Sequence, residues 1–368
     1  MKPRHRFVPL VATAMAGLLS IGLTACGGSG DSGGTQSKSG YKTLTMVDGA
    51  QTLSAFNAPY GDYAPKHAWK TAGIGVDVQL VQGGTQSAQL VATGKADVSI
   101  VGLSSALAVA AQSPNVKIVA VTGGNIWHLA VPKDSSVTSI DQLKGKTIGV
   151  QALNTGSYLY NRAALKLDGM SPDKDVKWLP IGTGAQAAQA VNSKQVAAVA
   201  TYDGPYEVLS GLTKGGMRVL PSPLDELDGS GAWIVNAKTL ESHRDQIVKF
   251  IRGMSETSLV AQSAPEDIIE ELFESHPDTK PRGVSDADAV TQTKALVKAY
   301  WSKIADMGPE GAYGVLSDAQ IAAAVKFHED AGMVEGKIDI AKTFDLSVSE
   351  EADKYDRAAS LKAQTSKS

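Results

Sequence analysis

Short apolar runs alternate with alanine-rich segments of helical spacing along the first part of the chain. The apolar runs cover 44–47, 76–81, 97–102 and 116–122, and the alanine-rich segments cover about 60–72, 86–93 and 104–112. These runs are continuous rather than alternating, which is typical of strands buried on both faces of a parallel sheet. This part of the sequence therefore predicts an α/β unit.

A second set of the same kind follows, and a helical region comes after it. Strands are predicted at 146–151, 176–181 and 196–202, and helices near 156–167 and 185–193. From about 239 to 330 the spacing of apolar residues predicts mostly helices. The sequence thus predicts two α/β units and extra C-terminal helices.

Residues 84–102 and 184–202 are similar to each other. They read GTQSAQLVATGKADVSIVG and GAQAAQAVNSKQVAAVATY, and each runs from a glycine through an alanine-rich helix into an apolar strand. Two copies of one unit, one per lobe, predict two similar sheets that face each other. Because ligands of such sheets bind beyond the carboxyl ends of the strands, we expect a shared cleft.

The first 25 residues have the composition of an export signal. Lys2, Arg4 and Arg6 precede an apolar stretch over 8–25, which is short for a membrane span. We therefore expect a signal peptide over 1–25.

The only cysteine follows this stretch directly. Leu23-Thr24-Ala25-Cys26 resembles the lipobox of bacterial lipoproteins, and a glycine- and serine-rich segment comes next. The resemblance implies lipid on Cys26, a flexible tether over 26–40 and a place on the extracytoplasmic face of the bacterial cell membrane. The alternative is an ordinary signal peptide with a chance cysteine.

Charge and composition argue against several classes of function. The formal net charge is −3, and loss of residues 1–25 removes three positive charges and no negative one, which leaves −6. A mildly acidic protein has no electrostatic attraction for nucleic acid. The six histidines never lie three or four residues apart, and the lone cysteine excludes a cysteine metal site. We expect no metal and no nucleic-acid partner.

Motifs for enzymatic chemistry are weak. Residues 182–187 fit the dinucleotide pattern G-x-G-x-x-A after a predicted strand, with Asp203 further on. Such patterns arise by chance in a chain rich in glycine and alanine, and an exported protein lacks a pool of the cofactor. The sequence has no phosphate-binding G-x-x-x-x-G-K-(S/T) loop and no nucleophile placed beside a base. We expect no cofactor and no catalytic residue.

Four stretches together carry a resemblance to a known family. They are GGTQSAQLVATGKADVSIVGLSSALA, HLAVPKDSSVTSIDQLKGKTIGV, NTGSYLYNRAAL and VAAVATYDGPYEVL. Over about 41–260 the chain resembles the sulfonate/nitrate/taurine and thiamine-pyrimidine-precursor binding proteins of ABC importers. The resemblance implies the type II periplasmic binding protein fold, with two Rossmann-like lobes of mostly parallel sheets joined by a hinge.

The same resemblance implies boundaries and partners. Lobe I would comprise 41–124 plus 234–362 and lobe II 125–233, with crossings near 122–127 and within 219–236. A monomer would carry a small solute to a membrane permease and its ATPase. Two alternatives stay open, namely a lipoprotein that senses a solute and signals to a membrane partner, and an enzyme of the pyrimidine-synthesis branch of this fold.

The candidate ligand-binding residues follow predicted strands, open predicted helices or lie near the crossings. They are Asp48, Gly49, Phe56, Gly84, Thr85, Gln86, Leu103, Ser104, Trp127, Asn154, Thr155, Gly156, Ser157, Tyr158, Thr183, Tyr202, Asp203 and Trp233. Helix starts offer free N–H groups that suit an anion. The alternative for each Ser or Thr is a plain N-cap, and for each Trp it is core packing.

The charges of these residues leave the class of ligand open. The candidate loops contain no Lys or Arg, so dipoles and hydroxyls alone would hold a sulfonate. Asp48 and Asp203 would oppose an anion if both face the cleft. They suit a heterocycle with amino donors better, and for each the alternative is a turn residue. The second-lobe strand reads AAVATYDGPY, where relatives more often have Asp-Ala at its start and Trp near its end.

Overall fold

A computed structural model of the chain describes residues 40–50, 52–153, 155–304 and 311–365. All of them belong to one compact unit, residues 35–368. The predicted signal peptide, Cys26, the tether up to residue 39 and the candidate Asn154 lie outside the described residues.

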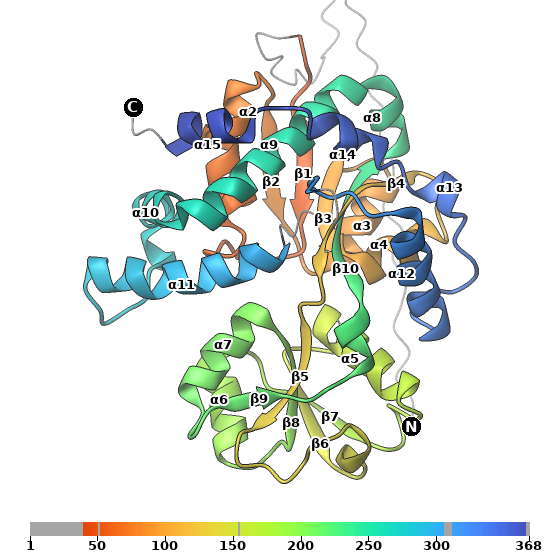
Figure 1. Cartoon of the computed structure of the whole chain (residues 1–368), viewed down its shortest axis with the longest axis vertical. Helices are drawn as coiled ribbons and strands as arrows, with labels where there is room; N and C mark the ends of the chain where they lie inside the picture. Colours follow the sequence, from red (N-terminus) through yellow and green to blue (C-terminus); the bar gives the residue numbers. More distant parts are fainter. Residues whose placement is uncertain (1–39, 51, 154, 305–310, 366–368) are drawn as a thin grey trace, which may run out of the picture. The chain divides into compact units, whose positions relative to one another are not determined.

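The first sheet has five strands in the order β2-β1-β3-β10-β4 (Figure 1). Their bounds are β1 (Leu44–Asp48), β2 (Val76–Leu80), β3 (Val98–Gly102), β4 (Val116–Gly124) and β10 (Asp228–Asn236). β1 is buried along its length, as its apolar run predicts. β2 alternates between exposed and partly buried residues because it is an edge strand.

The second sheet also has five strands, in the order β7-β6-β8-β5-β9. Their bounds are β5 (Trp127–Pro132), β6 (Thr147–Val150), β7 (Lys177–Pro180), β8 (Ala198–Tyr202) and β9 (Met217–Val219). The chain leaves the first sheet after Gly124 and enters the second at Trp127. It returns to the first sheet with β10.

Both sheets are mixed, and four of the five strands in each run in the same direction, which agrees with the prediction of mostly parallel sheets. β1 pairs in parallel with β2 and β3, and β6 with β7 and β8. β10 and β5 are antiparallel to both of their neighbours. β5 follows β4 after a two-residue connection, and β10 follows β9 with only the short η3 (Pro223–Glu226) between them. Neither strand is preceded by a long crossover helix of the kind that joins parallel strands. The predicted lobe boundary at 233 falls inside β10, and the division into lobes stays a prediction.

Helices follow the strands, and all those named next except α7 lie where the sequence predicts a helix. They are α3 (Gly84–Ala92), α4 (Leu103–Ala110), α5 (Gly156–Leu167), α6 (Gly184–Asn192) and α7 (Asp203–Leu212). The helix predicted over 60–72 is broken into η1 (Pro59–Tyr63), α1 (Ala64–Lys66) and α2 (Ala68–Thr71). Pro65 has no N–H to donate, so a regular helix cannot continue through this segment. Short η2 (Asp141–Leu143) and η3 (Pro223–Glu226) lie in connections.

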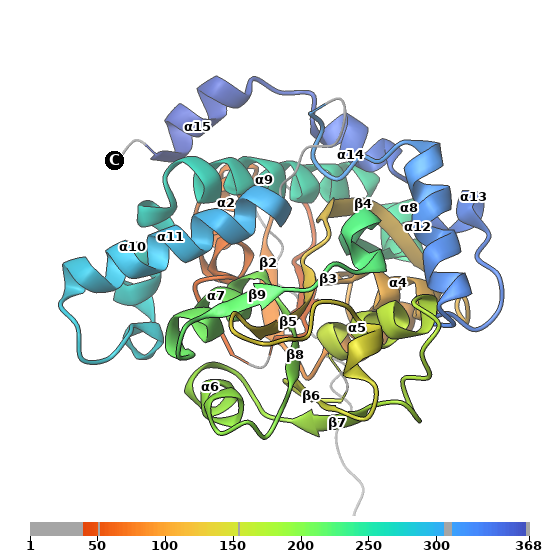
Figure 2. The same cartoon turned by 60° about the horizontal axis from the view of Figure 1, so that its bottom comes forward.

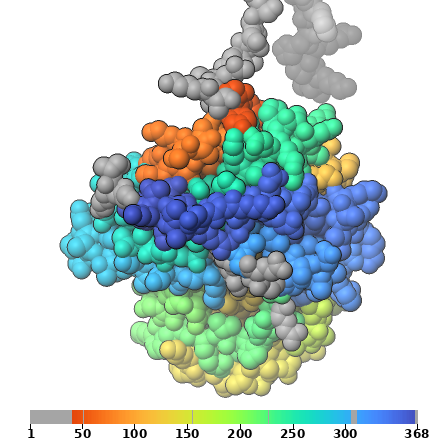
Figure 3. Space-filling view, turned by 45° about the horizontal axis from the view of Figure 1, so that its top comes forward, coloured from red at the N-terminus to blue at the C-terminus, as the bar shows by residue number. Residues whose placement is uncertain are grey.

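The C-terminal part is helical. Its elements are α8 (Ala237–Ser242), α9 (Arg244–Ser263), α10 (Pro265–Ser275), η4 (Pro277–Thr279), α11 (Asp286–Ile304), α12 (Asp318–Asp330), α13 (Ile340–Thr343), α14 (Ser347–Ala352) and α15 (Arg357–Thr365). α11 packs against α9 and α10 and also touches α7 and β4 (Figure 2). The last helices, dark blue in Figure 3, lie as a band over one face, where α14 and α15 contact α9. In the described part of the chain, every helix is too short or too polar to cross a membrane.

Apolar cores cover the two faces of the first sheet. On one face Met46 and Trp233 pack with Trp69 and Phe250 from the helices. On the other face Val47 packs with residues of α3, α4 and α12. This double burial explains why residues 44–47 of β1 are mostly apolar.

Candidate ligand-binding site

Asp48 is the last residue of β1, at the carboxyl end of a buried strand, and only 5% of its surface is exposed. Its Oδ2 accepts a hydrogen bond from Asn57 Nδ2 at 3.1 Å, and its Oδ1 accepts one from the Ala50 N–H at 3.2 Å. The hydroxyl of Tyr60 is a further hydrogen-bonding partner. Burial raises the pKa of Asp48 above its usual value, because burial disfavours the charged form.

Aromatic side chains from three segments surround this carboxylate. Phe56 contacts Tyr300 of α11 edge to face, with ring centroids 5.3 Å apart. Tyr60, Tyr202 and Tyr300 are all partly exposed. Burial is the main cause that raises the pKa of each of the three hydroxyls, and the charge of Asp48 raises it further. We call Tyr60, Tyr202 and Tyr300 the tyrosine cluster.

The two sheets approach each other at this cluster. Tyr202 ends β8 in the second sheet, whereas Asp48 ends β1 in the first. A Cβ atom built on Gly204 would lie 2.7 Å from the Phe56 ring, so only glycine permits this close approach. Trp301 of α11 donates a hydrogen bond from its Nε1 to the Phe56 carbonyl oxygen, at 3.1 Å.

Asp203 opens α7 and is 7% exposed. Its Oδ1 accepts hydrogen bonds from His128 Nε2 and from Lys303 Nζ, the latter at 2.8 Å. Its Oδ2 has no hydrogen-bond partner among the described residues. Lys303 comes from α11, so a cation does approach this region although the candidate loops contain none. The negative charge of Asp203 is already paired within the protein.

A buried hydrogen-bonded chain joins α4, α5 and α12. The Ser104 N–H, at the start of α4, donates to the Tyr160 hydroxyl at 3.0 Å. His328 Nδ1 lies 2.6 Å from the Ala324 carbonyl oxygen, so Nδ1 carries the proton. His328 Nε2 therefore accepts from the Tyr160 hydroxyl at 2.9 Å. Burial lowers the pKa of His328 from 6.5 to about 4.

Trp127 lies at the junction between the sheets. Its ring stacks on Tyr160 with centroids 4.8 Å apart, and a Cβ atom on Gly156 would lie 2.4 Å from it. Ser104 Oγ and Trp127 Nε1 make no well-aligned hydrogen bond, but both face the Tyr160 hydroxyl and influence its pKa. Trp127 thus packs between elements of both sheets, as a residue near a crossing should.

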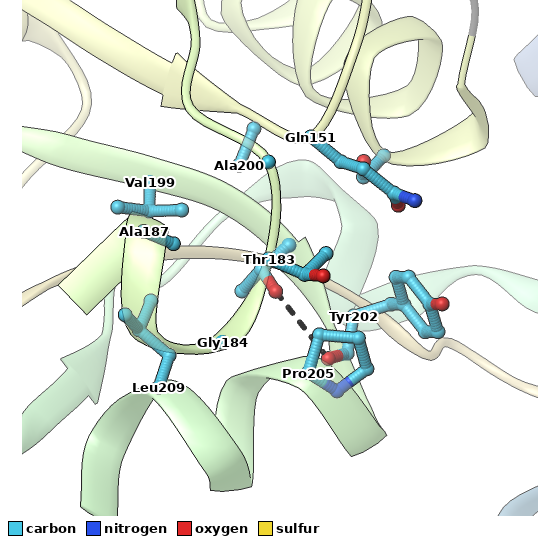
Figure 4. A pocket seen from close by; sticks show the side chains of 12 residues that line it. Gln151, Thr183, Gly184, Ala187, Val199, Ala200, Tyr202, Pro205 and Leu209 are labelled. Carbon is cyan, nitrogen blue, oxygen red and sulfur yellow. Dashed lines mark hydrogen bonds between the residues drawn. The ribbon is translucent and has the colours of Figure 1, made fainter. Parts of the chain in front are cut away.

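A small cavity opens beside the ends of β6 and β8 in the second sheet. Figure 4 shows Thr183, Tyr202 and Pro205 around this hollow, with Gln151 nearby. The hollow offers about 10 Å³, which is room for roughly one water molecule. Ser157 also lines it, so three of the candidate residues meet here.

The other candidate residues make local contacts. Trp233 is 1% exposed and packs in the core, where its Nε1 donates to the Tyr313 hydroxyl at 2.9 Å. Thr155 caps α5, and Tyr158 contacts Trp178 edge to face. Leu103 is a core residue, Gly49 lies against the backbone of Gly83 and Gly84, Thr85 faces Ser105, and Gln86 accepts from the Gln82 N–H.

The structure therefore brings together only part of the candidate set. Asp48, Phe56, Tyr202 and Asp203 lie near one another, whereas Tyr158 lies elsewhere. Trp233 borders this group through the Tyr60 ring, which it contacts edge to face. The sequence analysis missed Tyr60, Tyr300, Lys303, His128, Tyr160 and His328. No local sequence signal links these residues of other helices and strands to the candidate strand ends. Within the described ranges, no group of three or more His, Cys, Asp or Glu side chains could hold a metal ion.

Comparison with known proteins gives one family match and several structural neighbours. The family described as "NMT1/THI5 like" matches residues 66–268, more than half of the chain. YtlA of Bacillus subtilis, named as a candidate binding protein, is 25% identical over 253 residues, which cover 65% of this chain and 73% of YtlA.

Two solved structures show the same fold. The periplasmic aliphatic sulphonate binding protein SsuA of Escherichia coli is 16% identical with a TM-score of 0.61, over 82% of this chain and 91% of SsuA. The Candida albicans CA3427 gene product, described as having the generic periplasmic binding protein fold, is 14% identical with a TM-score of 0.56, over 83% and 96% of the two chains. The predicted α/β fold of this class is thereby confirmed.

Proposed function

Because this chain belongs to the NMT1/THI5-like family, we propose that it binds a small organic solute outside the cytoplasm and delivers it to the permease of an ABC importer. The observation that carries the proposal is the meeting of two sets of strand ends. Asp48 from the first sheet and Tyr202 from the second interact electrostatically, with Tyr300 beside them. We propose that these residues line the recess that receives the solute. Such a recess is where α/β sheets bind ligands.

The chemistry of the recess supports binding rather than catalysis. A buried carboxylate, three phenol hydroxyls and aromatic rings can orient a solute through hydrogen bonds and ring contacts. The solute is an organosulfonate or a pyrimidine-like nitrogenous compound, and the recess closes on it by a hinge motion at the two crossings.

Mass spectrometry tests this function directly. We expect the purified protein to carry a small organic molecule that is released on denaturation. Adding that molecule back at about 100 times its dissociation constant should stabilise the protein by about 2.7 kcal/mol, measured as a rise in the unfolding temperature. The proposal fails if no molecule is released and no organic solute raises the unfolding temperature.

We also propose that lipid on Cys26 anchors the protein to the membrane, on the strength of the lipobox alone. Cys26→Ser removes the sulfur that carries the lipid. The variant should appear in the medium or stay unprocessed, as judged by fractionation and intact mass. A processed variant that remains in the membrane fraction would contradict the anchor.

A further inference from the structure

Two buried carboxylates lie near the recess, and their partners differ. Asp203 is paired with Lys303 and His128. Asp48 is hydrogen-bonded by neutral groups only, and no Lys, Arg or His nitrogen lies within 4.0 Å of it in the described parts of the chain. The two carboxylates are therefore not equivalent, and only Asp48 lacks a positive counterpart.

The surroundings of Asp48 are aromatic. Tyr60 hydrogen-bonds to it, and Tyr60 also contacts the rings of Trp233 and Trp301 edge to face, at 5.8 and 6.2 Å. Phe56 contacts the ring of Tyr300, which belongs to α11, edge to face. Tyr202 adds a ring from the second sheet. Aromatic rings attract cations through their electron-rich faces, and a buried carboxylate is costly without a positive partner.

We propose that the bound solute carries a positively charged amine, protonated or quaternary, that lies against Asp48 within the tyrosine cluster. This inference rests on the proposed function and identifies the class of its solute. The amine of the solute supplies the positive charge that Asp48 lacks among the described side chains. The aromatic rings contact the amine in place of part of its hydration water. A sulfonate would face the same carboxylate with like charge, so the inference selects the nitrogenous class over the anionic one.

Matched probes test the charge without knowledge of the natural solute. Choline and 3,3-dimethylbutan-1-ol have nearly the same shape and differ in the charge of one atom, and benzylamine and benzyl alcohol form a second pair. We expect the wild-type protein to bind at least one cation roughly ten- to hundredfold more tightly than its neutral counterpart, measured by calorimetry. Methanesulfonate should bind more weakly than either cation.

Substitution of Asp48 assigns the effect to this residue. Asp48→Asn keeps the size and most hydrogen bonds of the side chain, and it should reduce the preference for the cation to less than about twofold. Asp97→Asn is the matched control, because Asp97 is a partly buried carboxylate that is paired with Lys42. Asp97 directly precedes β3, whereas Asp48 lies at the carboxyl end of the parallel strand β1. This control should leave the preference unchanged.

The outcomes separate this inference from the proposed function. Equal affinity for cation and neutral counterpart in both pairs, or a preference for methanesulfonate, overturns the inference. So does an uncharged or anionic solute released from the purified protein, although that result leaves the binding function intact. The comparison of probes on the wild-type protein needs no variant, so it decides the matter even if Asp48→Asn does not fold.

Discussion

Trp233→Ala is expected to lower the free energy of unfolding by about 3–5 kcal/mol. Trp233 is 1% exposed in β10 and contacts Phe250 edge to face at 5.3 Å. Its indole also donates to the buried Tyr313 hydroxyl, so truncation leaves a cavity and removes one hydrogen bond from that hydroxyl. Urea-induced unfolding followed by circular dichroism measures the loss.

Trp178→Ala is the control for this substitution. Trp178 is only partly buried in the edge strand β7, and its Nε1 donates to the Pro172 carbonyl oxygen. We expect a smaller loss than for Trp233→Ala. A loss below about 1 kcal/mol for Trp233→Ala, combined with weaker solute binding, would instead place Trp233 among the ligand contacts.

Acidification from pH 7 to pH 4 is expected to destabilise the protein through His328. The unfolded chain takes up a proton near pH 6.5, whereas the folded chain does so only near pH 4, because burial lowers the pKa of His328 to about 4. Stability therefore falls as the pH drops from 6.5 to 4. Below pH 4 the loss of unfolding free energy that is due to His328 approaches about 3 kcal/mol. Urea midpoints at several pH values measure the slope.

Two variants assign this slope to the imidazole. His328→Gln removes the titrating group and keeps an acceptor for the Tyr160 hydroxyl, so its stability should fall less steeply between pH 6.5 and pH 4. Tyr160→Phe keeps the buried imidazole and should retain the slope. Parallel profiles for wild type and His328→Gln would show that His328 does not titrate as its burial implies.

Most of the regular elements could be predicted from local sequence. The helix predicted over 156–167 is α5, and β1, β3 and β8 lie where apolar runs end in glycine or polar residues. β10 was not predicted as a strand, because its glycine-rich start, Gly229 and Gly231, resembles a connection. Its antiparallel orientation follows from its route between the sheets, which local pattern does not contain.

Part of the candidate site could likewise be proposed from the sequence, and part of it could not. Asp48, Tyr202 and Asp203 could be proposed because carboxyl ends of strands gather on one edge of a sheet. Tyr300 and Lys303 belong to a helix about 100 residues further along the chain, and a single sequence holds no sign that it folds back there. The candidate loops themselves contain no Lys or Arg, and the Lys303 that pairs with Asp203 comes from this distant helix. The role of each candidate in binding stays a prediction.

The central place of β10 in the first sheet sets an order of assembly during synthesis. The second sheet uses one continuous stretch, from β5 to β9, so its strands can pair as soon as that stretch has emerged. β4, by contrast, lies at an edge and has β10 as its neighbour in the sheet order. It must wait for a segment made much later, and closing that long loop costs chain entropy. The nascent chain therefore holds one finished sheet and an unpaired β4, and anything that delays β10 prolongs the exposure of that edge.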